Sequence, residues 1–80
     1  MSIPMDVSRG RLAKSSRQHI RAASRVWVER RNGPVYIIGF EAADGRFGYG
    51  VDGRGWVQIY ADAAAAWRSI ERARSAGSDR

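Results

Sequence analysis

The chain has 80 residues, and a chain of this length buries only about 60% of the surface that its unfolded form exposes, so we expect one domain with a small core. It has no cysteine, which excludes a disulfide framework and thiolate metal sites. Fourteen Lys and Arg against eight Asp and Glu give a net charge of +6, which favours nucleic acid, an acidic membrane or an acidic protein surface as partner.

Arginine supplies thirteen of the fourteen cations. Guanidinium groups bind phosphates and carboxylates through two parallel hydrogen bonds and stack on aromatic rings, whereas the lysine ammonium acts as a point charge. The codon preference of a GC-rich genome is an alternative explanation for the ratio of Arg to Lys, but it does not explain the net charge. The composition therefore points to an anionic partner.

The first residues lack the apolar run of a signal peptide, and no later stretch reaches the ~20 apolar residues that cross a bilayer. We therefore expect a cytoplasmic protein with no membrane partner. Residues 1–80 are expected to form the single domain, with residues 1–8 and 77–80 frayed at its ends.

Residues 9–25 contain six cations and no acid, and their spacing predicts a helix that Ser8 could cap. Four of the cations fall within about 80° of one another on a helical wheel. These are Lys14, Arg17, Arg21 and Arg25. The apolar side of this helix is thin, and like charges one turn apart oppose it. The pattern predicts a marginal basic helix, ordered when packed or bound.

From Val26 the hydrophobic period changes to two, which is typical of β-strands. Strands are predicted over residues 26–31, 35–41 and 46–52, and a shorter fourth one over residues 56–60. The pairs Asn32-Gly33 and Asp44-Gly45 mark tight turns between them. The sequence predicts an antiparallel meander of three to four strands.

Asp62 is suited to cap a last helix, because its carboxylate accepts hydrogen bonds from free backbone N–H groups. Alanines and two larger residues form an apolar stripe along it, and Gly77 ends it. We expect this helix to pack on one face of the sheet with Trp67 as its anchor. The predicted class is α+β, with a C-terminal helix on a meander and a marginal N-terminal helix.

Gly48 and Gly50 alternate with large residues in the third strand. Glycine weakens a strand, so this face requires the close approach of another group. One interpretation is tight packing of the alanine-rich C-terminal helix, and the other is an open face for a flat ligand such as a base or a partner strand. Because one helix cannot cover both faces of a sheet, some of the eight aromatic side chains are expected to stay accessible.

Catalysis finds little support in the sequence. The single histidine, His19, lies among cations and is expected to be solvated. The acids at positions 44, 52 and 62 fit turns and caps, and no metal-binding, acyl-transfer or nucleotide-binding motif is present. We therefore expect no enzyme activity and no catalytic, cofactor or metal site.

The candidate binding site is the basic block of residues 14–31 with two nearby aromatic residues. Its members are Lys14, Arg17, Arg21, Arg25, Arg30, Arg31, Trp27 and Tyr49. A solvated charged face is the alternative, although such faces usually mix both signs. Aromatic residues beside arginines suit the stacking of bases and are equally typical of protein interfaces.

The order of helix, strands and helix, with the stretch GRFGYGVDGRG before an alanine-rich helix, resembles double-stranded RNA-binding domains. Those domains place lysines at the start of the final helix, where this chain has Asp62-Ala63-Ala64, and this argues against that function. Residues 26–74 are also similar in topology to the arm-binding domains of phage integrases, whose sheet enters a DNA groove.

The chain also resembles the small inhibitor proteins of phages and mobile elements, which include anti-CRISPR proteins against type I systems. The resemblance lies in its small size, its strong charge and its lack of enzyme motifs, and not in a shared sequence motif. The resemblance implies an inhibitor that docks on a host protein or nucleoprotein surveillance complex, on an acidic or RNA-bearing surface, and blocks target DNA capture. The alternative is a stand-alone protein that binds DNA or RNA directly through the arginine-rich helix and a face of the sheet.

Overall fold

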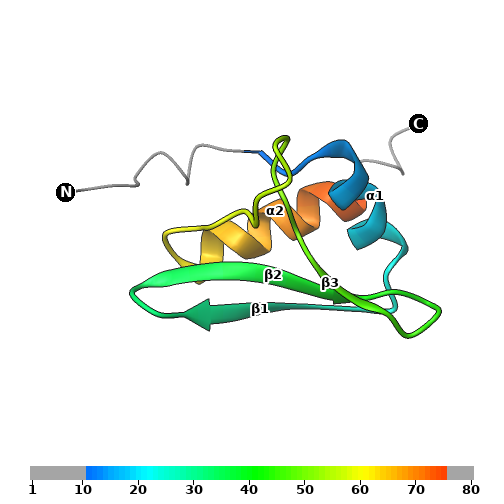
Figure 1. Cartoon of the computed structure of the whole chain (residues 1–80), viewed down its shortest axis with the longest axis horizontal. Helices are drawn as coiled ribbons and strands as arrows, with labels where there is room; N and C mark the ends of the chain where they lie inside the picture. Colours follow the sequence, from blue (N-terminus) through cyan, green and yellow to red (C-terminus); the bar gives the residue numbers. More distant parts are fainter. Residues whose placement is uncertain (1–10, 76–80) are drawn as a thin grey trace.

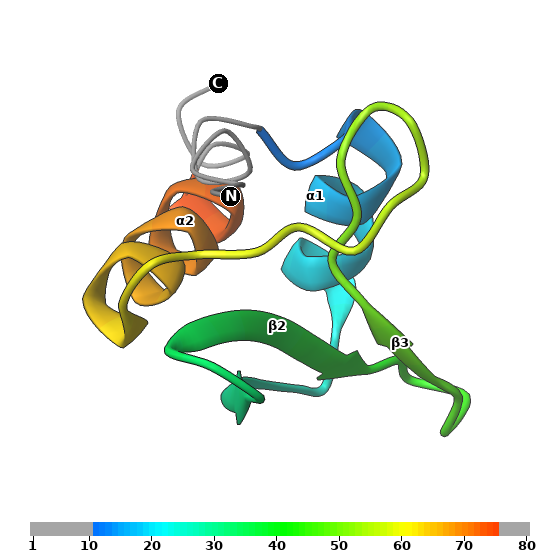
Figure 2. The same ribbon diagram turned by 60° about the vertical axis from the view of Figure 1, so that its left-hand side comes forward.

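A computed structural model describes residues 11–75 of the chain as an α+β fold, which confirms the predicted class. Three antiparallel strands form a sheet in the order β1-β2-β3, and both helices lie on the same face of it (Figures 1 and 2). In chain order the elements are α1 (Lys14–Ala22), β1 (Arg25–Arg31), β2 (Val35–Glu41), β3 (Phe47–Tyr49) and α2 (Ala63–Ser75). The predicted frayed ends and the Ser8 cap lie outside the described residues.

The register of the sheet places Val28 beside Ile38, and Trp27, Gly39 and Tyr49 in one row. The turn between β1 and β2 has Gly33 at φ 76°, the left-handed conformation that glycine adopts without strain. The predicted fourth strand is replaced by two isolated bridges, one of which joins Tyr36 to Tyr60. The sheet therefore has three strands, and residues 50–61 cross its helix-bearing side as a loop.

The first helix is shorter than the charge pattern predicts. It ends at Ala22, because the backbone adopts an extended conformation at Ala23, with ψ at 147°. Arg25 consequently belongs to β1, and its predicted place on the helix is wrong. Leu12 and Ile20 fix α1 in the core, at 4% and 0% exposure. The buried Ser16 hydroxyl accepts a hydrogen bond from the Val51 backbone N–H at 2.8 Å. These contacts order α1 in the absence of a partner.

The second helix packs on the sheet through Ala66, Ile70 and Ala73, which are buried and lie one turn apart. Asp62 caps it as predicted, since its Oδ1 accepts from the Ala65 backbone N–H at 2.8 Å. The prediction that Trp67 anchors this helix is wrong. Trp67 follows Ala66 by about 100° around the helix axis and is 43% exposed. Small side chains thus bring α2 close to the sheet.

The paired glycines of the third strand serve close packing, and not an open face. A Cβ atom at Gly48 would lie 2.7 Å from Cζ of Phe40, and one at Gly50 would lie 2.8 Å from Cδ2 of Leu12. Another group does approach this face closely, but the prediction that the C-terminal helix is that group is wrong. The group that approaches Gly50 is Leu12, in the segment before α1, and not the alanines of α2.

Tyr60 joins the loop to α2 and gives the fold a dependence on pH. Its buried hydroxyl donates to Ser69 Oγ at 2.8 Å. Burial raises the pKa of Tyr60 above its ordinary value of 10.0, and the Ser69 hydrogen bond and the charge of Arg72 oppose that rise. The folded state then holds this proton more tightly than the unfolded state, so the contribution of Tyr60 to stability is complete below pH 10.0 and is lost as pH rises through the folded pKa.

Denaturant titrations of wild type and Tyr60→Phe should show a steeper loss of stability above this pH in wild type. Stability that falls equally with pH in both proteins would contradict the assignment.

Candidate functional site

The second face of the sheet is covered by no element among residues 11–75 (Figure 2). Because side chains alternate along a strand, every second residue of each strand lies on it. We call this surface the open face. It consists of Arg25, Trp27, Glu29 and Arg31 from β1, Val35, Ile37, Gly39 and Glu41 from β2, and Phe47 and Tyr49 from β3.

Three aromatic rings gather at one end of the open face. The indole of Trp27 lies across Gly39, where a Cβ atom would be only 2.5 Å from its Cε2. The rings of Trp27 and Phe47 meet edge to face, with centroids 6.2 Å apart at 79°. Phe47 is 68% exposed and Tyr49 is 40% exposed. This geometry is a favourable aromatic contact, and it leaves most of the Phe47 ring and part of the Tyr49 ring accessible to a partner.

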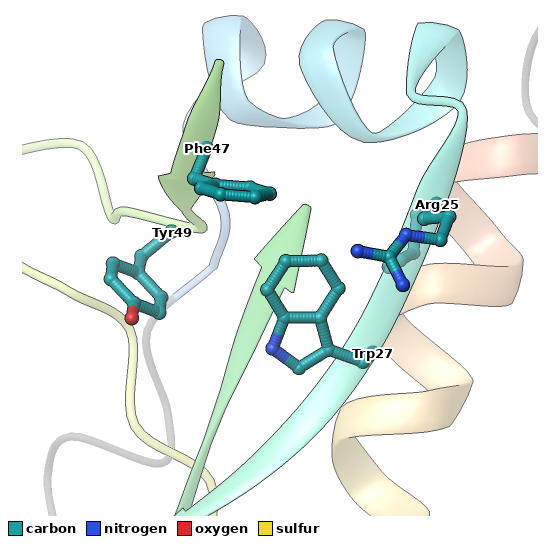
Figure 3. Close-up of a pocket in the computed structure, with 5 residues that line it drawn as sticks. Arg25, Trp27, Phe47 and Tyr49 are labelled. Atoms are coloured by element: carbon teal, nitrogen blue, oxygen red, sulfur yellow. The ribbon is translucent and has the colours of Figure 1, made fainter. Parts of the chain in front are cut away.

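A shallow depression of about 490 Å³ opens between these rings (Figure 3). Arg25, Val26, Trp27, Phe47 and Tyr49 line it. Arg25 and Trp27 come from β1, and Phe47 and Tyr49 from β3. The missing side chain of Gly39, on the strand between them, lets the Trp27 indole lie across β2 toward the β3 rings. The depression is wide enough for a side chain of another molecule.

Both arginines of the open face are held beside aromatic rings and carboxylates. Nε of Arg25 donates to Glu41 Oε1 at 2.8 Å, and its guanidinium lies 5.6 Å from the centre of the Trp27 ring. The Arg31 guanidinium lies 5.5 Å from the centre of the Tyr49 ring and donates to the Tyr49 hydroxyl at 3.2 Å.

Glu29 completes this network from the middle of β1. Its Oε2 is 3.1 Å from Arg31 Nη2, and its Oε1 accepts from Trp27 Nε1 at 3.1 Å. Each of the two arginines of the open face is therefore paired with a carboxylate on the same face. The surface is rich in aromatic and arginine side chains, yet its charges are balanced.

The structure divides the predicted binding residues between two surfaces. Arg25, Trp27, Arg31 and Tyr49 come together on the open face. Lys14, Arg17 and Arg21 lie on α1, on the other side of the sheet (Figure 1). Successive side chains of a strand lie on opposite faces, so Arg30 lies on the side of β1 that bears the helices, opposite to that of Glu29 and Arg31. The expected single basic surface is thus two separate ones.

We call the exposed side chains of Lys14, Arg17 and Arg21 the α1 basic face. Arg17 donates to the Leu12 carbonyl, 2.6 Å from its Nη1. No carboxylate among residues 11–75 forms an ion pair with any of the three. Within the described part of the chain, the α1 basic face therefore differs from the open face in having no carboxylate paired with its cations.

Sequence reasoning missed Phe47, Glu29 and Glu41 as parts of the site. The available signal was the alternation of side chains along a strand. It places residues 25, 27, 29 and 31 on one face of a strand and residues 47 and 49 on one face of another. His19, expected to be solvated, stacks on Phe40 with ring centroids 5.5 Å apart, while still exposed on its other side. Within residues 11–75, no three potential metal ligands come together and no helix is long and apolar enough for a bilayer.

Gly39 offers a test of the aromatic arrangement. Gly39→Ala should displace the Trp27 indole, because the new methyl group would lie 2.5 Å from it, while the helix-bearing core remains intact. We expect a changed near-ultraviolet circular dichroism and tryptophan emission with an unchanged far-ultraviolet spectrum. Gly53→Ala is the matched control, since no atom lies within 4 Å of its Cβ position. Equal spectra for wild type and Gly39→Ala would show that Trp27 does not lie over Gly39.

Comparisons with protein-family models, with curated proteins and with solved structures found no match to this chain.

Proposed function

We propose that this chain is a non-enzymatic inhibitor of the anti-CRISPR type, which docks through its open face on a host nucleoprotein surveillance complex and blocks capture of target DNA. The observation that carries the proposal is the cluster of Trp27, Phe47 and Tyr49 on a face of the sheet that no described element covers. A small domain gains nothing for its own stability from leaving such rings in water, so a partner that buries them explains their placement.

The charge balance of the open face favours a protein partner there. A phosphate backbone is bound by cations that release counterions, and Arg25 and Arg31 are already paired with Glu41 and Glu29. The carboxylates would repel phosphates at close range. Tyrosine, tryptophan, phenylalanine and arginine are instead the residues that protein interfaces enrich and on which their affinity depends most. These exposed ion pairs contribute little stability, so a partner can rearrange them at small cost.

The α1 basic face supplies a second contact, toward an acidic or RNA-bearing surface of the same complex. Lys14, Arg17 and Arg21 are exposed and have no carboxylate partner among residues 11–75. The open face and the α1 basic face lie on opposite sides of the sheet (Figure 2). A protein of this shape can contact a protein subunit with one side and an anionic element with the other, which suits a nucleoprotein target.

The proposal is tested by titrating the purified chain into a type I surveillance complex and measuring capture of labelled target DNA. We expect inhibition that saturates at a fixed stoichiometry and weakens only modestly between 50 and 200 mM salt, about the range over which phosphate-based binding loses orders of magnitude. Undiminished DNA capture at excess inhibitor would overturn the proposal for that class of complex.

The second candidate function is direct binding of nucleic acid, which the uncompensated cations of α1 favour. Three phosphate contacts give a slope of about −2.7 for log K against log salt, at about −0.9 for each phosphate of duplex DNA. Mobility shifts on duplex DNA, single strands and duplex RNA at two salt concentrations measure this slope. Tight binding to bare nucleic acid with that slope favours the second candidate, and binding only to the protein complex favours the first.

Charge reversal on α1 separates the roles of the two surfaces. Lys14→Glu with Arg21→Glu should slow association with the complex about tenfold and leave dissociation nearly unchanged, because charges at the rim of an interface act mainly on the rate of encounter. The matched control is Arg54→Glu with Arg68→Glu, two exposed cations outside the α1 basic face, which changes the net charge equally. Equal slowing in both variants would attribute the effect to net charge alone. Surface plasmon resonance measures both rates.

A further inference from the structure

The first strand forms an edge of the sheet, since the strand order is β1-β2-β3. Its seven residues pair with β2 on one side, and no residue between 11 and 75 pairs with it on the other. An edge of this length exposes a row of backbone donors and acceptors that can pair with another strand.

The hydrogen bonds of the sheet determine which residues of β1 direct their backbone groups outward. The Gly50 N–H donates to the Ile38 carbonyl at 2.9 Å, so even-numbered residues of β2 direct their backbone groups toward β3, and odd-numbered ones toward β1. In the register of the sheet, Trp27 pairs with Gly39. The backbone N–H and C=O groups of the odd-numbered residues of β1 therefore pair with β2. Val26, Val28 and Arg30 direct their N–H and C=O groups out of the sheet.

Four of the seven residues of β1 are charged, which discourages pairing of edges, but Arg25 and Glu29 carry opposite charges and the backbone of the strand is regular. The described segment contains no proline, and it runs in continuous register with β2 over residues 25–31, without a bulge. Apolar residues occupy its centre, at positions 26–28. The indole of Trp27 leans away from the edge, over Gly39, and so does not cover it.

We propose that β1 pairs with β1 of a second copy of this chain, antiparallel and about a two-fold axis between the two Trp27 residues. In this register Val26 lies opposite Val28 of the second copy, so the outward backbone groups of both strands meet. Arg25 lies opposite Glu29 of the second copy, and the two-fold axis repeats this contact, so each dimer contains it twice. Arg25 gives only its Nε to Glu41, which leaves its terminal amino groups for this contact.

Charge complementarity selects this register among those that match the outward backbone groups. A shift of two residues in one direction sets Arg25 against Arg31 of the second copy, which places like charges opposite each other. The same shift in the other direction sets Arg25 against Trp27 and leaves Glu29 opposite Ala23. Only the proposed register sets Arg25 and Glu29, two of the four charged residues of β1, opposite a charge of the other sign. The Ser24 N–H already donates to the Glu41 carbonyl at 2.8 Å, so the new pairing is confined to residues 25–29. It joins the two sheets into one of six strands, with both open faces on the same side.

Two charge variants test the register without touching the core. Arg25→Glu sets Glu against Glu29 of the second copy, and Glu29→Arg sets Arg against Arg25, so each variant alone should dimerise about tenfold more weakly or worse than wild type. A mixture of the two restores opposite charges at both contacts and should form a heterodimer. Sedimentation velocity distinguishes a dimer from the 8.9 kDa monomer. Monomeric wild type at millimolar concentration, or a mixture no more associated than its components, would overturn the proposal.

A cysteine cross-link provides an independent test, because the chain has no cysteine of its own. Residues opposite each other in a pair without mutual hydrogen bonds have Cβ atoms about 4.5–5.5 Å apart, close enough for a disulfide after a small adjustment. Trp27→Cys should therefore form a covalent dimer under mild oxidation. Tyr49→Cys lies on the same face but on β3, at the opposite edge of the sheet, and equal cross-linking by both variants would indicate random collision and refute the pairing. The dimer does not depend on the proposed function, since inhibition of DNA capture is measured separately.

Discussion

Replacing Ile38 with alanine is expected to lower the free energy of unfolding by about 2–5 kcal/mol, among the largest changes in stability from a single substitution in this fold. Ile38 is fully buried in the central strand, with Val28 beside it in β1 and Gly50 on its other side. The close approach of Leu12 and Ile20 at Gly50 leaves the surrounding groups little freedom to fill the cavity. Since small domains are stable by only about 5–15 kcal/mol, much of the total is lost.

Urea unfolding followed by circular dichroism measures this change. Val57→Ala is the control, because Val57 is 40% exposed and its truncation should lower stability by about 0.5 kcal/mol or less. If both substitutions had the same effect, Ile38 would not be at the centre of the core, and the placement of both helices on one face of the sheet would be wrong.

Replacing Trp27 with alanine is expected to weaken inhibition of DNA capture by about 30-fold or more, which corresponds to about 2 kcal/mol of binding free energy. Trp27 is the centre of the open face, because it contacts Phe47, lies over Gly39 and donates to Glu29. Its removal flattens the depression and frees Arg25 from the ring beneath it.

Trp56→Ala is the matched control for this experiment. Trp56 is 68% exposed in the loop between β3 and α2, outside the open face, so its loss removes the same indole from a different surface. We expect the Trp56 variant to inhibit as wild type does. Equal losses from the two substitutions would remove the reason for placing the partner on the open face.

The elements of the fold followed from local patterns in the sequence. The apolar run over residues 35–41, the Asn32-Gly33 turn and the Asp62 cap are short-range signals, and the structure agrees with each. The basic helix was found but predicted too long. The charge spacing of three and four residues continues to Arg25, whereas burial of Ala23 and pairing of residues 25–31 end the helix at Ala22.

The composition of the open face depends on contacts between strands, which a single sequence does not specify. The carboxylate of Glu41 meets Arg25 because of the register, sixteen residues apart in the chain. Likewise, Trp67 was predicted to be buried because it is large and apolar, but alanines occupy the closest approach of α2 to the sheet. The sequence indicated which residue types are candidates for binding, and tertiary structure decided which of them share a surface.

Radical footprinting of the inhibitor, free and bound to the surveillance complex, tests most directly whether the open face is the docking surface. The structure predicts that oxidative labelling of Trp27, Phe47 and Tyr49 falls on binding, while labelling of Trp56, which is 68% exposed, stays the same. Protection of Trp56 with unchanged labelling of the three open-face rings would contradict the account.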